Sequence, residues 1–344
     1  MFSFDKEELK KKIEKISQPR VLVVGDLAID EMIYGNTARM SREAPVLILR
    51  HYDTKIILGA ASNAAHNLST LNNGRVSVIG TYGNDFYGPI LLDALKAANI
   101  NTEYMVMDDS RATTVKTRIS GSCSQSVTQQ IVRIDRETVE ELCSNVEHKI
   151  IENLEKAIPE HDAVILSDYN IGMMTTNVIK KTIEIAKRYN KVVTVDAQKD
   201  LDRYYGATAM TPNQPDTEKF IGYFIKDSET LARAGQDMLE KTNNEIVLVT
   251  RGGDGMCVFE KNGNISKIPV FNKTDVFDVT GAGDTVVASF TLALAAGLTP
   301  EDAAIIGNLA ASIVIRHFGC ATTSVKELIK ILDKLNMDDL TIRV

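Results

Sequence analysis

The residues best suited to chemistry lie in the stretch 273–297, where a Gly-Ala-Gly-Asp string ending at Asp284 precedes a long apolar run. The run has no charged residue and ends at Gly297, so it predicts a buried helix that begins at the glycines. The first N–H groups of a helix have no partner within the helix and attract anions, and glycine lets an anion approach them. Asp284 would then lie beside the anion, where a carboxylate could take a proton from an attacking hydroxyl group. An ordinary glycine turn with Asp284 as a helix cap is the alternative interpretation.

The full string D-V-T-G-A-G-D-T at 278–285, followed by the apolar helix, resembles the C-terminal signature of the ribokinase-like (PfkB) carbohydrate kinases. The resemblance implies an α/β fold: a ribokinase-like three-layer sandwich with a mostly parallel central sheet and a small β-sheet lid. It also implies ATP and Mg²⁺ as cofactors, an anion hole for the transferred phosphoryl group and Asp284 as the catalytic base. The catalytic group implied in this way is Gly281, Ala282, Gly283 and Asp284.

Two segments resemble the nucleotide side of the same family. The pattern Thr250-x-Gly252-x-x-Gly255 resembles a loop that lies along the phosphates of the nucleotide. Asn308 and Gly319 belong to the segment 308–324, which walls the adenine in relatives, with Asn308 near the base. These five residues are therefore the implied nucleotide contacts.

The metal side is less complete. Thr-Pro-Asn213 followed by Asp216 resembles an Asn-x-x-Glu motif that organises metal-bound water, although the carboxylate here has a shorter reach. The resemblance implies that Asn213 serves the cofactor and that Asp216 acts on magnesium through water. Asp278 and Thr280 coincide with a monovalent-cation loop of some members, so K⁺ is a candidate further cofactor.

Carboxylates that follow an apolar strand are candidate sugar ligands. Asp26 and Asp30 follow the strand predicted at Val21–Gly25, and the carboxyl ends of strands face the crevice where open α/β sheets bind ligands. The resemblance favours Asp30, whereas either residue could be a turn former. Asp168 ends the strand predicted at Ala163–Ser167, in a sequence similar to S-D-Y-x-K-G of heptose kinases. Ile171 replaces the lysine of that motif, and this departure weighs against a heptose 7-phosphate substrate.

The segment 58–63 resembles the N-terminal family signature G-G-A-A-x-N, with Leu58 in place of the first glycine. Gly59, Ala60 and Asn63 are the positions to which the signature assigns sugar contacts. A well-packed Ala/Asn helix is the alternative.

The segment 112–137 contains the most specific indication of a substrate. T-x-K-T-R-I and Q-Q-x-V-R-I-D-x-E resemble the D-glycero-D-manno-heptose 7-phosphate kinase branch of the superfamily. Lys116, Arg118 and Arg133 would supply positive charge for a phosphorylated substrate, and Gln130 could bind hydroxyl groups. Cross-strand pairing on a solvated sheet, for instance Arg133 with Asp135, is the alternative.

Short apolar strands alternate with helical stretches along the chain, which indicates βαβ units and a parallel sheet. The regions 33–57 and 104–135 break this alternation and predict paired strands, with decorated surface loops as the alternative. The resemblance implies that these strands form the lid. No long linker or repeat divides the chain, so we expect a single kinase domain over residues 1–344.

Composition limits the alternatives. The 344 residues carry a formal net charge of −7, which disfavours nucleic-acid and anionic-membrane partners. The four cysteines are scattered without a CxxC pair, and the charged N-terminus does not resemble a signal peptide. We therefore expect a cytoplasmic protein with reduced thiols. The family resemblance, separately, implies a homodimer formed through the lid, as relatives often have.

The leading functional hypothesis is phosphorylation of the heptose 7-phosphate at its anomeric hydroxyl to give the 1,7-bisphosphate, which feeds ADP-heptose biosynthesis. Bifunctional relatives carry a nucleotidyltransferase domain, and because no H-x-G-H motif occurs here we expect a separate adenylyltransferase. Another sugar kinase of the family, for fructose, ribose or a nucleoside, is the first alternative. A non-catalytic sugar or nucleotide sensor is the second.

Overall fold

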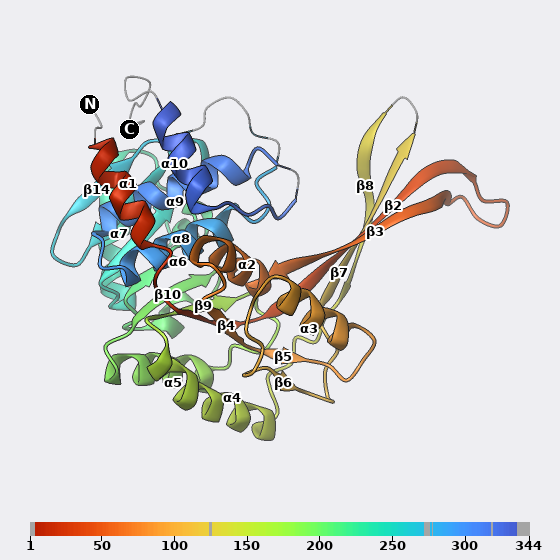
Figure 1. Cartoon of the computed structure of the whole chain (residues 1–344), viewed down its shortest axis with the longest axis horizontal. Helices are drawn as coiled ribbons and strands as arrows, with labels where there is room; N and C mark the ends of the chain where they lie inside the picture. The colour runs from red at the N-terminus through yellow and green to blue at the C-terminus, as the bar shows by residue number, and fades with distance from the viewer. Residues whose placement is uncertain (1–3, 124–125, 272–275, 277, 318, 336–344) are drawn as a thin grey trace.

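The computed structural model describes residues 4–123, 126–271, 276, 278–317 and 319–335. Figure 1 shows a body of helices packed around a sheet, from which two long hairpins project to one side. The helices of the body are Lys6–Lys15 (α1), Ala61–Asn72 (α2), Tyr87–Ala97 (α3), Ser144–Ala157 (α4), Thr176–Arg188 (α5), Gln214–Ile221 (α6), Ser228–Thr242 (α7), Ala282–Ala295 (α8), Pro300–Val314 (α9) and Val325–Lys334 (α10). Short 3₁₀ turns occur at Ile158–Glu160, Leu201–Tyr204 and Gly252–Asp254.

The central sheet has the strand order β14-β13-β12-β11-β10-β9-β1-β4. Its strands are Val21–Gly25 (β1), Val76–Ile79 (β4), Ala163–Asp168 (β9), Val192–Ala197 (β10), Ala209–Met210 (β11), Ile246–Thr250 (β12), Met256–Glu260 (β13) and Ile265–Ile268 (β14). From β4 to β12 every neighbouring pair is parallel, and β13 and β14 continue the sheet as antiparallel strands. The sheet is therefore mostly parallel, as predicted.

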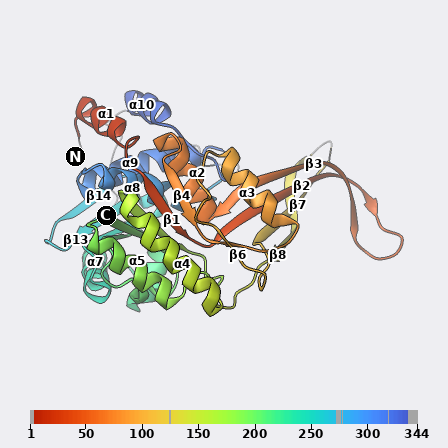
Figure 2. The same ribbon diagram turned by 60° about the horizontal axis from the view of Figure 1, so that its bottom comes forward.

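Alternation along the buried strands assigns the two faces of the sheet. Val21 and Val23 pack into a core with α2, α8 and α9, whereas Leu22 and Val24 pack into a second core with α4, α5 and α7. Figure 2 shows α4 and α5 crossing one face while α1, α8, α9 and α10 cover the other. Because side chains alternate across a strand, a strand that is apolar throughout requires helices on both faces, and the result is the expected three-layer sandwich.

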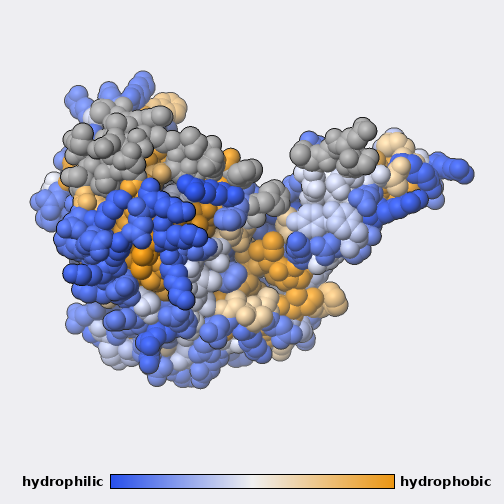
Figure 3. Space-filling view, turned by 45° about the horizontal axis from the view of Figure 1, so that its top comes forward, coloured by the Kyte–Doolittle hydropathy of each residue, from blue (hydrophilic) through white to orange (hydrophobic). Residues whose placement is uncertain are grey.

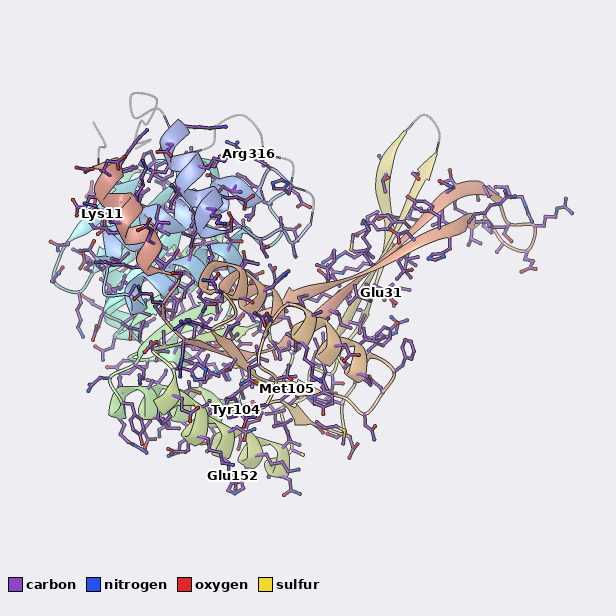
Figure 4. All side chains as sticks on the ribbon, in the orientation of Figure 1. Lys11, Glu31, Tyr104, Met105, Glu152 and Arg316 are labelled. Carbon is purple, nitrogen blue, oxygen red and sulfur yellow. The ribbon has the colours of Figure 1, made fainter. Side chains whose placement is uncertain are left out.

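The lid is a separate sheet with the order β3-β2-β7-β8. It consists of Leu27–Met40 (β2), Leu47–Ala60 (β3), Val115–Cys123 (β7) and Ser126–Arg136 (β8). One face of the lid is attached to the body through Glu31 (Figure 4). The Glu31 carboxylate accepts a hydrogen bond from the Tyr87 hydroxyl of α3 at 3.2 Å and another from Thr117 Oγ1 of β7 at 2.7 Å. The opposite face carries Asp30, Lys116 and Arg118. Asp30 of β2 pairs with Lys116 of β7, and Arg118 lies two residues after Lys116 on the same strand.

Three boundaries differ from the prediction. The lid starts at Leu27 rather than near residue 33, because β2 follows β1 almost without a break. The segment 104–114 is not part of the lid; Val106–Met107 (β6) instead pairs with Thr81–Tyr82 (β5). The last strand of the lid, β8, ends at Arg136 rather than at residue 135. Within the described residues, no helix has the length and apolar character needed to cross a bilayer.

Candidate active site

Two hollows lie next to each other at the carboxyl ends of the parallel strands, where α8 also begins. The larger, of about 280 Å³, is mostly apolar, and the smaller, of about 200 Å³, is lined by carboxylates and amides. Thr250 and Gly283 line both hollows, so the two spaces adjoin at the start of α8. An open α/β sheet binds ligands at this edge because the polar ends of its strands and helices converge there.

Asp284 lies in the wall of the smaller hollow and is only 6% exposed. Its carboxylate accepts one hydrogen bond from Asn63 Nδ2 at 2.6 Å and another from the Tyr169 hydroxyl at 2.8 Å. Burial raises the pKa of Asp284 to about 6, although both hydrogen bonds act in the opposite direction because they favour the charged form. A carboxyl group with this pKa can be ionised at neutral pH and still accept a proton, which suits a general base.

The start of α8 leaves backbone donors available. Gly281 has φ of +77°, and a Cβ built on it would lie 2.6 Å from Asn63 Nδ2, so glycine is required here. The N–H of Ala282 donates to the Val279 carbonyl at 3.2 Å, which removes it from the expected anion hole. The N–H groups of Gly283 and Asp284 have no acceptor among the described residues. The anion-binding donors are therefore fewer than the sequence motif suggested.

Two further carboxylates lie near Asp284. Asp196, at the end of β10, and Asp216, in the first turn of α6, line the same hollow. Burial and the charges of Asp284 and Asp216 raise the pKa of Asp196 to about 7. Burial also raises the pKa of Asp216, while Asn213 caps α6 by accepting the Asp216 N–H at 2.8 Å. Mutual repulsion of this kind is relieved when a cation binds between the carboxylates.

The donor set fits Mg²⁺ that keeps its water. Hard carboxylate oxygens are the ligands that Mg²⁺ prefers, and this ion is usually held through only one or two of them. Among the residues that the structure describes, no group of three or more acidic, histidine or cysteine side chains is arranged to hold a metal directly. Asp196 and Asp216 therefore suit a hydrated ion better than a fully protein-ligated one.

The larger hollow has the character of a nucleotide site. Four of the five predicted nucleotide residues line it, namely Thr250, Gly252, Gly255 and Asn308. Gly255 has φ of +85°, and a Cβ there would lie 2.1 Å from the Ile268 carbonyl oxygen. Asn308 Nδ2 donates to the Pro269 carbonyl at 2.7 Å and so holds the wall together.

The fifth residue, Gly319, is used differently. Its N–H donates to Asp278 Oδ2 at 2.9 Å, and the N–H of Thr280 donates to Asp278 Oδ1 at 2.9 Å. Burial raises the pKa of Asp278, but these hydrogen bonds outweigh it, and the pKa lies below its usual value. Asp278 thus closes the loop before α8, and a monovalent cation beside Asp278 and Thr280 remains a prediction. Residues 273–275 and 277 of this stretch lie outside the described residues.

On the sugar side, one oxygen of Asp30 forms an ion pair but accepts no hydrogen bond from the described residues. Asp30 is 6% exposed, and the oxygen is Oδ1, which lies 3.5 Å from Arg118 Nη2. Burial raises the pKa of Asp30, while Arg118 and Lys116 lower it in part. A Cβ on Gly59 would come within 3.2 Å of the Asp30 carboxyl carbon, so glycine gives the carboxylate its space. Ala60 follows with φ of +49° at the N-cap of α2.

The predicted basic residues of the lid do not all reach the hollows. Lys116 Nζ lies 5.3 Å from the centroid of the Tyr169 ring, so Lys116 is close to the body, whereas Arg118 lies beside Asp30 of the lid. Arg133 pairs with Asp135 at 2.9 Å on the exposed face of β8, as the alternative interpretation held. Gln130 is also exposed. Arg133 lies opposite Arg118 in the β7–β8 pairing, and its charge helps to lower the pKa of Asp30, which burial raises.

Asp26 and Asp168 are already occupied. Asp26 accepts the N–H of Tyr169 at 2.8 Å and of Met173 at 3.2 Å. Asp168 accepts the Tyr204 hydroxyl at 2.5 Å and the N–H of Asn170 at 2.7 Å. The protein's own donors use both carboxylates to hold the turn after β9, and sugar contacts of Asp26 and Asp168 stay a prediction.

The amide nitrogen of Asn63 donates to Asp284, and a sugar contact of Asn63 stays a prediction. Sequence reasoning overlooked Tyr169 and Asp196. Asp196 could have been found, since it ends an apolar strand in the same way as Asp168. Tyr169 had only its place after Asp168 as a signal.

The family described as pfkB family carbohydrate kinase matches residues 18–327. A curated protein of Desulfatibacillum aliphaticivorans named bifunctional protein HldE is 39% identical over 92% of this chain and 63% of its own length. The protein of the same name from Helicobacter hepaticus is 36% identical over 91% of this chain and 63% of its own length. This chain thus spans a little under two thirds of these relatives.

Solved structures show the same fold at low sequence identity. Phosphofructokinase-2 from Escherichia coli in complex with substrates and products superposes with a TM-score of 0.74 at 17% identity, covering 92% of this chain and 99% of that one. Arabidopsis thaliana ribokinase complexed with ribose and ATP gives a TM-score of 0.68 at 16% identity, covering 92% and 99%. The fold is therefore ribokinase-like.

Proposed function

The chain belongs to the pfkB family of carbohydrate kinases, and on that premise we propose that it transfers the γ-phosphoryl group of ATP to the anomeric hydroxyl of D-glycero-D-manno-heptose 7-phosphate. As a member of the family it is a phosphotransferase that acts on a sugar hydroxyl group. The finer assignment has support from the similarity to bifunctional HldE proteins over most of the chain. The lid face that carries Lys116 and Arg118 also supports this assignment, because it supplies positive charge.

One observation carries the catalytic part of the proposal. Asp284 is a buried carboxylate with a pKa of about 6, placed where the apolar hollow and the polar hollow adjoin. The nucleotide occupies the apolar hollow along Gly252 and Gly255, and the sugar lies on the side of Asp30. Asp284 removes the proton of the sugar hydroxyl as its oxygen attacks the γ-phosphorus, and ADP leaves.

The transferring phosphoryl group is stabilised by charge and by fixed donors. The N–H groups of Gly283 and Asp284 are directed to it at the positive end of the α8 dipole. Asp196 and Asp216 would hold hydrated Mg²⁺, which neutralises phosphate charge when bound. Asn63 keeps the Asp284 carboxylate oriented throughout. The protein's work is thus positioning and electrostatics.

The sugar phosphate is recognised by the lid. Asp30 accepts a sugar hydroxyl with its Oδ1 oxygen, and Arg118 and Lys116 supply the positive charge that a phosphate requires. Arg133 and Gln130 join only when the lid closes and excludes water, which would otherwise compete as acceptor.

One departure from the heptose-kinase pattern has a partial counterpart in space. Ile171 stands where the motif has lysine, and the Arg111 guanidinium lies 3.0 Å from a Cβ built on the neighbouring Gly172. Arg111 already donates to the Glu140 carbonyl at 2.6 Å. The Arg111 cation therefore lies beside this turn, but it is already bound to the Glu140 carbonyl. For this reason the alternative sugars are included in the test below.

The test is ADP release against a panel of acceptors: heptose 7-phosphate, unphosphorylated heptose, fructose, fructose 6-phosphate, ribose and a nucleoside. The proposal expects kcat/KM for heptose 7-phosphate at least about a hundredfold above the other acceptors, because the phosphate contacts are charge-assisted. Preference for another acceptor would replace the substrate. ADP release with none of them, in a folded protein that binds ATP, would favour the sensor.

We also propose that the lid forms a homodimer. Apolar side chains are exposed on its hairpins, among them Tyr52, Ile56, Ile131 and Ile134. Figure 3 shows apolar surface where the lid meets the body. Sedimentation of Ile131→Lys should show a monomer, whereas Val139→Lys, which changes an exposed residue outside the lid, should leave the dimer intact. A monomeric parent protein would end this proposal.

A further inference from the structure

Tyr169 is held from three directions. Its backbone N–H donates to Asp26 Oδ2 at 2.8 Å, and its hydroxyl donates to Asp284 Oδ1 at 2.8 Å. Its ring faces the lid, with Lys116 Nζ 5.3 Å from the centroid. The side chain therefore forms a direct path of contacts from lid strand β7 to the carboxylate of Asp284.

We propose that Tyr169 is a positioning residue that couples the position of the lid to the orientation and proton affinity of Asp284. The proposal rests on the proposed function in one respect, since it takes Asp284 to be the base. It adds to the reaction a residue that acts through Asp284 rather than by contact with the sugar or the nucleotide.

The physical basis is the stiffness of this path. Asp26 fixes the backbone at Tyr169 and again at Met173, so the turn after β9 cannot shift freely. A tyrosine side chain then has only two torsions, and its ring is held between Lys116 and Asp284. An ammonium group over the ring face draws electron density from the phenol, which makes the hydroxyl a stronger donor. Withdrawal of Lys116 with the lid weakens that donor.

Several charged groups act on Asp284 together, and their signs are mixed. Asp30 from β2 raises the pKa of Asp284, whereas Lys116 from β7 lowers it. Asp196 of β10 and Cys320 of the 319–324 loop are further titratable neighbours, and the pKa of each is raised first by burial and in addition by the charge of Asp284. Asn63 and Tyr169 are the two groups that donate hydrogen bonds to it.

The first experiment measures coupling without any need for turnover. The pKa of Asp284 is followed by NMR of ¹³Cγ-labelled aspartate, with Asp284→Asn used to assign the resonance. Tyr169→Phe should raise this pKa by about one unit, because a donor to the charged form is lost. Lys116→Met should raise it more in the parent protein than in a Tyr169→Leu background, since the ring that transmits the lid charge is then missing.

The second experiment uses kinetics and a matched control. Tyr169→Phe keeps the ring beside Lys116, so kcat should fall about tenfold, KM for ATP should change less than about twofold, and the acid limb of kcat/KM should move to higher pH. Tyr204→Phe removes the same kind of buried hydroxyl, which donates to Asp168 at 2.5 Å. That control should lose stability and leave the acid limb in place.

Two outcomes would overturn the coupling. Additive effects of Lys116→Met and Tyr169→Leu on the pKa of Asp284 would show that the lid charge acts without the ring. Equal losses of stability in Tyr169→Phe and Tyr204→Phe, with neither acid limb moved, would leave Tyr169 a structural residue only. Failure of the proposed function would give a different result, namely normal turnover in Asp284→Asn.

Discussion

Replacing Asp284 by asparagine should make the protein more stable while it removes activity. The two partners of the carboxylate can be kept, because asparagine can accept from Asn63 Nδ2 with its oxygen and donate to the Tyr169 hydroxyl with its nitrogen. The substitution therefore removes one buried charge and the general base while leaving the side-chain volume almost unchanged.

The magnitude follows from the pKa. Folding raises the pKa of Asp284 from 3.8 to about 6, so the ionised carboxylate is less favourable in the folded state than in the unfolded state. Two pKa units correspond to about 3 kcal/mol, and this is the upper limit of the gain when the charge is removed. The destabilisation is absent below about pH 4, where both states are protonated, grows between about pH 4 and 6, and is constant above.

The assay is urea unfolding of the parent protein and Asp284→Asn at pH 4 and pH 8, with turnover and ATP binding measured at pH 8. The variant should gain about 1 to 3 kcal/mol at pH 8, little at pH 4, and lose at least about a hundredfold in kcat. ATP binding should remain, because the nucleotide hollow is lined by other residues.

Asp278→Asn is the matched control with the opposite sign. Hydrogen bonds from Thr280 and Gly319 hold the pKa of Asp278 below its usual value, so its charge stabilises the fold at neutral pH and that stability is lost as pH falls. This variant should be less stable than the parent at pH 8. A stability loss in Asp284→Asn at pH 8 would refute the burial argument, and near-normal turnover would remove Asp284 as the base.

Three further predictions follow from the same site. The kcat/KM of the parent should fall as pH falls through about 6, because Asp284 must be ionised to accept a proton; a flat profile from pH 5 to 8 would contradict this. Gly255→Ala should lower the urea midpoint and weaken ATP binding, because its Cβ would clash with the Ile268 carbonyl at 2.1 Å; an unchanged midpoint would count against that geometry. Binding of Mg²⁺ without nucleotide should tighten from pH 6 to 8, since Asp196, with a pKa of about 7, must lose its proton; calorimetry with Asp196→Asn as control checks it.

The layered fold and the start of α8 could be predicted from the amino-acid pattern alone. Strands such as Val21–Gly25 are apolar on both faces, and a parallel sheet covered by helices is the arrangement that buries both. Gly281 could be identified because a glycine string directly before a long uncharged run predicts a helix start, and Gly281 is the N-cap of α8. Patterns of this kind depend on near neighbours in the chain, so they can be read without the tertiary structure.

The lid was predicted in kind but not in extent. Its strands lack a helical period, which the sequence shows, whereas their length depends on which partner strand continues to supply hydrogen bonds. Leu27 belongs to the lid because it pairs with Ala60, the last residue of β3. No local pattern contains that information.

Which carboxylates keep an oxygen without a hydrogen-bond donor could not be predicted before the fold was known. Asp26, Asp30, Asp168 and Asp284 all come after or near an apolar segment and look alike in sequence. Asp26 is occupied because the N–H of Tyr169, 143 residues away, reaches it, whereas Asp30 keeps an oxygen without a hydrogen-bond partner among the described residues. A carboxylate's role depends on the donors around it, and those donors are brought from distant segments by the packing of the fold.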